Sequence, residues 1–218
     1  MNTISFKSHA KVNIGLQVLG ERNDGYHDIH TMFQELEFHD NVHISKKDHG
    51  CELFSNDNDF PLNETNTCHT AYTVVKDAGH EIGGISVHVE KSIPQGAGLG
   101  GGSSNGAAII RGLNELYECG LSNTEMENLA LKVGADVPFF IQGKTQLGEG
   151  IGEKLTPIDI EIDFAYLLVI SPVSISTSWA YSALKNGLEG SVEKTNFASL
   201  SKGIQSLLSF LRMILNGL

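Results

Sequence analysis

Residues 93–114 read IPQGAGLGGGSSNGAAIIRGLN, a glycine-rich stretch that joins an alternating strand pattern, residues 84–92, to an alanine- and isoleucine-rich helical pattern. Glycine is favoured where main-chain N–H groups approach a ligand closely, because it has no Cβ. A helix N-terminus adds unpaired N–H donors and a partial positive charge. The stretch therefore predicts a phosphate-binding loop at the start of a helix that runs from about Ser104 to Tyr117.

Three common phosphate-binding loops do not fit this stretch. Residues 96–101 satisfy the dinucleotide-binding pattern G-x-G-x-x-G, but that fold needs a second strand with an acidic end about 20 residues later, and that position falls in a helical pattern. A Walker A loop needs a lysine, which Gly102-Ser103-Ser104 lacks. The His-Arg-Asp and Asp-Phe-Gly tripeptides of protein kinases do not occur. A flexible surface turn would explain the glycines alone, but the serine pair at the expected helix cap favours a ligand loop.

The composition is that of a globular protein, with 40% hydrophobic and 19% charged residues among 218. The formal net charge of −11 argues against a non-specific binder of nucleic acid or membrane surfaces, so an anionic ligand has to be captured locally. Cys51, Cys68 and Cys119 fit neither a disulfide framework nor a zinc site. The N-terminus has no apolar signal core, and the apolar run at 164–170 is too short to span a bilayer. We therefore expect a soluble cytoplasmic protein.

The hydrophobic periodicity predicts strands first and helices later. Strands are expected at residues 3–19, 30–38, 41–47, 84–92 and 145–150, with turns at 24–25, 49–50 and 56–58. Residues 66–78 predict a helix ended by Gly79, and Ser122 with Glu125 has the spacing of a capping box that opens another helix.

The pattern restarts after Pro157 with the apolar run 164–170, which predicts a buried strand. A turn at 171–177 and two helical segments follow, and Trp179 is expected in a helix core. We therefore expect two domains, residues 1–158 and residues 159–218.

The segment PQGAGLGGGSSNGAA resembles the second motif of the GHMP small-molecule kinases, Pro-x-x-x-Gly-Leu-Gly-Ser/Gly-Ser-Ser. Residues 10–34 and 134–157 resemble one branch of that family. The resemblance implies an α+β fold with a ribosomal-S5-like N-terminal domain and an incomplete C-terminal α/β domain. It also implies that ATP, with Mg²⁺, phosphorylates the 2-hydroxyl of a cytidine-diphosphate-linked methylerythritol in the non-mevalonate isoprenoid route. The alternatives are another GHMP kinase, acting on homoserine or mevalonate, and a nucleotide-binding module without catalysis.

The same resemblance assigns the catalytic residues. It makes Asp136 the base that accepts the proton of the substrate hydroxyl, although a turn aspartate could equally cap local N–H groups. It places Lys11 beside that carboxylate, where a cation keeps it ionised and stabilises charge on the reacting oxygen. The nucleotide is assigned to Asn66 and to the loop Pro94, Gln95, Gly96, Ala97, Gly98, Leu99, Gly100, Gly101, Gly102, Ser103 and Ser104. The alternative for Asn66 is that it caps the helix that it opens. Either serine could reach a magnesium ion, whose ligands the sequence leaves open.

The substrate pocket is assigned in the same way. Tyr26 and His27 resemble cytosine recognisers, and aromatic stacking with directed hydrogen bonds is a usual way to hold a base. Asn13 shares a strand face with Lys11, because side chains alternate along a strand. Thr177 and Tyr181 resemble further substrate contacts. The spacing of His27 and His30 is weak evidence for a metal site.

One family feature is missing from the sequence. GHMP kinases carry a third, glycine-rich motif near the C-terminus, and nothing like it follows residue 160. In the family this motif closes over the active site, so without it the phosphates are less well enclosed. We therefore expect weak nucleotide binding through residues 94–104 and little or no turnover by this chain.

Overall fold

The computed structural model describes residues 2–160, 165–170 and 179–180. These residues form strands and helices in the α+β arrangement predicted from the sequence. The elements are β1 (Thr3–Glu21), β2 (His27–Lys47), β3 (Cys51–Ser55), α1 (Thr67–Asp77), β4 (Gly84–Glu90), α2 (Gly101–Leu116), α3 (Asn123–Val133), α4 (Phe139–Gln142), β5 (Thr145–Gly150) and β6 (Lys154–Pro157). No helix in these ranges is long and apolar enough to cross a membrane.

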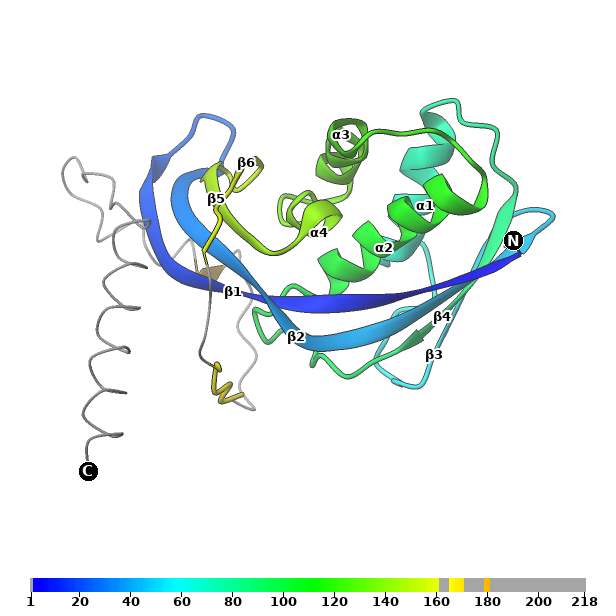
Figure 1. Ribbon diagram of the computed structural model, residues 1–218, viewed down its shortest axis with the longest axis horizontal. Helices are drawn as coiled ribbons and strands as arrows, with labels where there is room; N and C mark the ends of the chain where they lie inside the picture. The colour runs from blue at the N-terminus through cyan, green and yellow to red at the C-terminus, as the bar shows by residue number, and fades with distance from the viewer. Residues whose placement is uncertain (1, 161–164, 171–178, 181–218) are drawn as a thin grey trace.

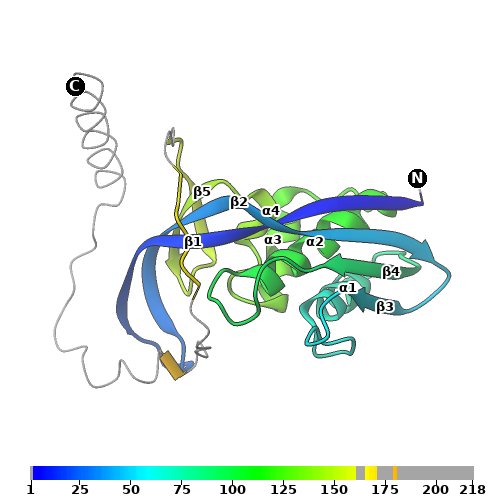
Figure 2. The same cartoon turned by 90° about the horizontal axis from the view of Figure 1, so that it is seen from below.

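The strand β2 is the centre of a six-stranded sheet. Along one edge it pairs antiparallel with β1, and along the other its two halves pair with β4 and β5. β3 lies parallel to β4, and β6 lies antiparallel to β5. The helices cover one face of the sheet (Figure 1), and the curved β1–β2 hairpin extends beyond them, as the view from below shows (Figure 2).

The core lies between this sheet and the helix α2. Alternate residues of β2 and β4, such as Ile44 and Val87, meet the fully buried face of α2 that carries Ile109 and Leu113. Gly112 permits this close approach, because a Cβ at that position would overlap the Ile44 side chain. α2 is thus fixed against the sheet, and its first turn is held in place with it.

Two of the differences from the predicted element boundaries bear on the site. Residues 30–38 and 41–47 belong to one continuous strand, β2, because Asp40 does not form a turn but lies fully buried within the strand. α2 begins at Gly101, three residues before the predicted start. Its N-cap is Gly100, which has a φ of 72°, so no serine caps this helix.

Other local predictions are confirmed. Asn66 caps α1, and Ser122 and Glu125 form both hydrogen bonds of a capping box at the start of α3. The short elements β3, α4 and β6 were not predicted.

The predicted buried strand at 164–170 is wrong for the part that the structure describes. Residues 165–170 have no strand assignment, and Leu167 and Val169 are 90% and 88% exposed. Among residues 165–170, only Tyr166 and Leu168 pack against the small cluster formed by Ala10, Leu36, Ile93 and Leu99. Trp179 is 62% exposed and therefore not a core residue. The predicted turn at 171–177, the two C-terminal helical segments, Thr177 and Tyr181 lie outside the described residues, so the two-domain division stays a prediction.

Candidate active site

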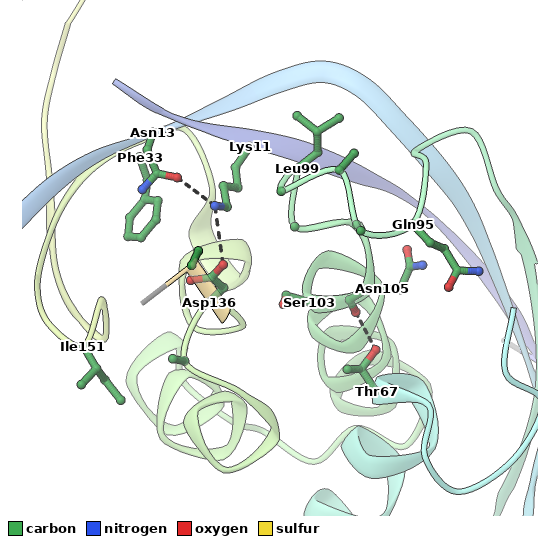
Figure 3. Close-up of a pocket in the computed structure, with 18 of the residues that line it drawn as sticks. Lys11, Asn13, Phe33, Thr67, Gln95, Leu99, Ser103, Asn105, Asp136 and Ile151 are labelled. Carbon is green, nitrogen blue, oxygen red and sulfur yellow. Dashed lines mark hydrogen bonds and ion pairs between the residues drawn. The ribbon is translucent and has the colours of Figure 1, made fainter. Parts of the chain in front are cut away.

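A cleft of about 1110 Å³ opens beside the glycine-rich loop. Residues from the loop, from β1, from the β1–β2 hairpin and from the turn after α3 line it together (Figure 3). The predicted site residues among its lining are Lys11, Asn13, Tyr26, His27, Asn66, Asp136 and residues 94–103. One cleft therefore brings together nearly all of the site residues that lie in the described ranges.

The glycine-rich loop turns sharply into α2. Gly96, Gly98 and Gly100 all have positive φ values, between 70° and 73°. At Gly100 the space is also restricted, because a Cβ there would lie 2.8 Å from the Phe140 ring. The N–H groups of the first turn of α2 have no carbonyl partner within the helix, as at any helix start, and they add positive potential to this end of the cleft.

The two serines of the loop have different environments. Ser104 is 3% exposed, and its hydroxyl accepts a hydrogen bond of 2.7 Å from the Ser8 hydroxyl on β1. Ser103 lines the cleft, and Figure 3 shows it on the side of α2 that faces Asp136. Ser104 thus ties α2 to the sheet, and Ser103 is the serine available to a ligand.

A buried carboxylate anchors the start of the loop. Asp40 is fully buried, and its Oδ1 accepts hydrogen bonds from the backbone N–H groups of Ser92, at 2.7 Å, and Ile93, at 2.8 Å. Its other oxygen pairs with the amine of Lys91. Asn56 accepts a further hydrogen bond of 2.7 Å from the backbone N–H of Lys91. This anchor was not predicted from the sequence, where its only local signal is an acidic residue at an inward position of an alternating strand.

Lys11 and Asp136 meet across the cleft, and the Lys11 amine lies 3.6 Å from a carboxylate oxygen of Asp136. Lys11 is 7% exposed, and its amine also donates a 2.8 Å hydrogen bond to Asn13 Oδ1. The amine lies 5.6 Å from the centre of the Phe33 ring, a contact that the sequence did not predict. The cation is therefore held by two neighbours, and the Asp136 side chain, 40% exposed, keeps access to the cleft.

A short backbone turn positions Asp136. α3 ends at Val133 with Gly134 as its C-cap, and α4 begins after Pro138. The N–H of Val137 bonds the carbonyl of Gly134 at 3.1 Å, which closes the turn. Pro138 is the N-cap of α4, so Asp136 lies in a short turn between two helix ends.

The β1–β2 hairpin carries the predicted cytosine recognisers. The backbone N–H of Tyr26 donates to Asp24 at 3.1 Å, and Arg22 pairs with Asp24 and Asp28. The pKa of Asp24 is lowered, first by this N–H of Tyr26 and then by Arg22, while hydrogen bonds to Asp28 and Asp24 raise the pKa of Arg22. The turn places His27 at 8% exposure and Tyr26 at 55% exposure on the cleft wall.

Asn66 has two structural partners. Its Oδ1 accepts from the N–H of Cys68 at 2.9 Å as the cap of α1, and its Nδ2 donates to the Pro61 carbonyl at 2.6 Å. The capping interpretation is confirmed, and Asn66 lines the cleft as well.

A magnesium site made by the protein alone is absent from residues 2–160, 165–170 and 179–180, which contain no group of three or more potential ligands from His, Cys, Asp and Glu. The cleft does offer the Asp136 carboxylate and the Ser103 hydroxyl. Mg²⁺ commonly binds one or two protein oxygens together with substrate phosphates and water. These donors therefore fit an ion that arrives with a nucleotide.

Comparison with known proteins agrees with this geometry. The family profile described as GHMP kinases N terminal domain matches residues 66–144. The described part of the chain thus has the fold and the glycine loop of a GHMP kinase N-terminal domain. A protein of Clostridium botulinum named 4-diphosphocytidyl-2-C-methyl-D-erythritol kinase is 35% identical over 215 residues, 94% of this chain and 77% of that relative. The chain therefore belongs to the GHMP kinase family, in the group of the 4-diphosphocytidyl-2-C-methyl-D-erythritol kinases.

Further relatives agree. The relative from Acetivibrio thermocellus with the same name is 40% identical over 185 residues, 85% of this chain, and the chain spans only 65% of that relative's length. A crystal structure of 4-(cytidine 5'-diphospho)-2C-methyl-D-erythritol kinase aligns with a TM-score of 0.62 at 35% identity, covering 72% of this chain and 56% of that one. Homoserine kinase from Cytophaga hutchinsonii, at 18% identity and a TM-score of 0.59 over 93% of this chain and 65% of that one, shares the fold.

Proposed function

We propose that the chain carries the active site for ATP-dependent phosphorylation of the 2-hydroxyl of 4-diphosphocytidyl-2-C-methyl-D-erythritol, a step in isoprenoid precursor synthesis. The observation that carries the proposal is the Lys11–Asp136 pair, which lies in the same cleft as the start of α2 and its glycine loop. Phosphoryl transfer needs a positioned hydroxyl and compensated phosphate charge more than covalent chemistry by the protein. The names of the relatives supply the substrate.

Asp136 is the proposed base. It accepts the proton of the 2-hydroxyl as the hydroxyl oxygen forms a bond to the γ-phosphorus of ATP. The bond from that phosphorus to the bridging oxygen breaks, and ADP leaves with the electron pair. Lys11, 3.6 Å from the carboxylate, stabilises the negative charge on the reacting oxygen.

The proposed phosphate site is the loop Pro94–Ser103 with the first turn of α2. Backbone N–H groups and the helix dipole favour an anion there. Ser103 would hold Mg²⁺ together with the phosphates, and the bound ion would neutralise their charge. Ser104 is not proposed as a ligand, because its hydroxyl is engaged with Ser8.

The proposed cytidyl site is the hairpin end of the cleft. His27 would hydrogen-bond the cytosine edge, and the exposed ring of Tyr26 would stack on the base. Asn13, which accepts from Lys11, would contact the substrate near the reacting hydroxyl, and Thr177 and Tyr181 are proposed to complete the pocket. The proposed compartment is the cytoplasm, a reducing environment that suits three free thiols.

A single-turnover assay tests this function against its alternatives. The chain is mixed in excess over substrate with Mg²⁺-ATP, so that even slow transfer is visible, and the product is identified by phosphorus NMR. Transfer is expected to be slow, well below the usual enzyme turnover of about 1 to 10³ per second. We expect its product to carry phosphate on the 2-hydroxyl of the cytidyl substrate, with none on homoserine or mevalonate offered in parallel. Transfer to either of those alcohols in preference would favour another GHMP kinase. ATP binding without transfer to any of them would favour a nucleotide-binding module.

A further inference from the structure

Asn105 carries a buried amide that has no partner in the described part of the chain. It lies in the second turn of α2, lines the cleft and is 0% exposed. Neither its Oδ1 nor its Nδ2 makes a hydrogen bond to any of the described residues. A buried polar group without a partner destabilises a fold, so natural structures contain few of them and each one calls for an explanation.

Other buried amides around the cleft differ from Asn105. Asn66 uses both its oxygen and its nitrogen in hydrogen bonds to neighbouring backbone. Gln34, on β2, donates to the carbonyl of Glu35 and accepts from the Thr145 hydroxyl. Asn105 alone among these three keeps a free donor and a free acceptor, and it keeps them in the wall of a ligand cleft.

The position of Asn105 separates it from the reacting end of the cleft. In Figure 3, Ser103 lies on the Asp136 side of α2, whereas Asn105 lies on the side of Gln95. Gln95 bonds Asp57 at 3.3 Å, so the segment that contains the cleft residues Phe60 and Pro61 is tied to this side. Phe60 and Pro61 contribute apolar surface to this part of the cleft and Asn105 contributes a free amide, a combination that suits a flat heteroaromatic group more than a phosphate.

The free groups of Asn105 specify the chemistry of their ligand. Phosphate oxygens can only accept hydrogen bonds, so they would satisfy Nδ2 and leave Oδ1 buried and unpaired. Adenine presents an amino donor next to a ring-nitrogen acceptor, and an asparagine amide pairs with that edge through two hydrogen bonds. We propose that Asn105 recognises the adenine of the nucleotide and makes the site selective for ATP, an inference that rests on the proposed kinase function.

The test compares ADP with inosine diphosphate, in which the amino group is replaced by a carbonyl. Calorimetric titration of the full chain is expected to give at least about tenfold tighter binding of ADP than of inosine diphosphate. Asparagine pairs with the amino group and N7 of adenine, whereas inosine diphosphate presents two acceptors on that edge, so one polar atom of the Asn105 amide stays unpaired in either orientation. Asn105→Leu, which has a similar shape and no polar atoms, is expected to reduce this preference to about twofold or less. Its melting temperature without nucleotide is expected to equal or exceed that of the parent, since it removes an unpaired buried amide.

Asn114→Leu is the matched control on the same helix. The amide of Asn114 is fully used, donating to the carbonyl and accepting from the N–H of Leu121. This variant is expected to lower the melting temperature and to leave the ADP preference unchanged.

The outcomes distinguish the two proposals. If the parent binds both diphosphates equally, or if Asn105→Leu is destabilised and keeps the preference for ADP, the assignment of Asn105 is overturned while the kinase proposal stands. If the parent binds no adenine nucleotide at all, the kinase proposal fails and the assignment of Asn105 fails with it.

Discussion

The amine of Lys11 lies 3.6 Å from the carboxylate of Asp136, although the two residues come from β1 and from the turn between α3 and α4. The same amine donates to Asn13, so the pair belongs to a small polar group inside the cleft. An amine held between two oxygen acceptors has a fixed position. This arrangement provides both a proton acceptor and a neighbouring positive charge for a reacting hydroxyl.

Asp136→Asn is expected to abolish most phosphoryl transfer and to leave ATP affinity within a few-fold. The amide keeps the shape of the carboxylate but cannot accept the proton, and general-base catalysis contributes about 10²- to 10⁴-fold in rate. Single-turnover rates and nucleotide titrations measure the two effects separately. Near-parental transfer by this variant would remove Asp136 from the mechanism.

The two loop serines are expected to respond differently to substitution. Ser103→Ala should weaken the binding of Mg²⁺-ATP and change the melting temperature little, because Ser103 faces the cleft. Ser104→Ala should lower the free energy of unfolding by about 1 kcal/mol or more, because it leaves the buried Ser8 hydroxyl without its acceptor. Thermal melts and nucleotide titrations of both variants check this, and the reverse pattern would contradict the assignment of Ser103 to the ligand.

His27→Ala is expected to weaken binding of the cytidyl substrate roughly tenfold, since a lost buried hydrogen bond is worth about 1.5 kcal/mol. ATP affinity should be unchanged, because His27 lies on the hairpin and not on the glycine loop. Titration of the variant with each ligand is the measurement. Equal losses for both ligands would mean that His27 is structural.

Asp40→Asn is expected to lower both stability and nucleotide affinity. It leaves the buried Lys91 amine without a carboxylate, and breaking a buried ion pair typically destabilises by about 3–5 kcal/mol. It also weakens the acceptor that holds the N–H groups of Ser92 and Ile93 ahead of the loop. Asp59→Asn, at an exposed position, is the control that should change neither quantity. A stable Asp40 variant with parental ATP affinity would show that the anchor does not position the loop.

Features set by neighbouring residues were predictable from the sequence. The capping box of Ser122 and Glu125 and the cap at Asn66 depend on contacts within a few residues, and both were confirmed. The glycine loop and its helix were also predicted, because a run of glycines directly ahead of a helical pattern is a local signal, and the structure gives Gly96, Gly98 and Gly100 positive φ values.

Features set by distant residues were not predictable. The continuity of β2 depends on Asp40 finding Lys91, Ser92 and Ile93 far along the chain. The distinction between Ser103 and Ser104 depends on Ser8 in β1. The apolar run at 164–170 was expected to be buried, but a strand is buried only where partners cover both faces, and in the described part only Tyr166 and Leu168 find such partners.

The most direct measurement is the single-turnover reaction of this chain with Mg²⁺-ATP and 4-diphosphocytidyl-2-C-methyl-D-erythritol, followed by phosphorus NMR and repeated with Asp136→Asn. If the cleft that holds Lys11 and Asp136 is the active site, phosphate appears on the 2-hydroxyl with the parent chain and not with the variant. The same yield from both proteins, or transfer to a different alcohol in preference, would contradict that assignment.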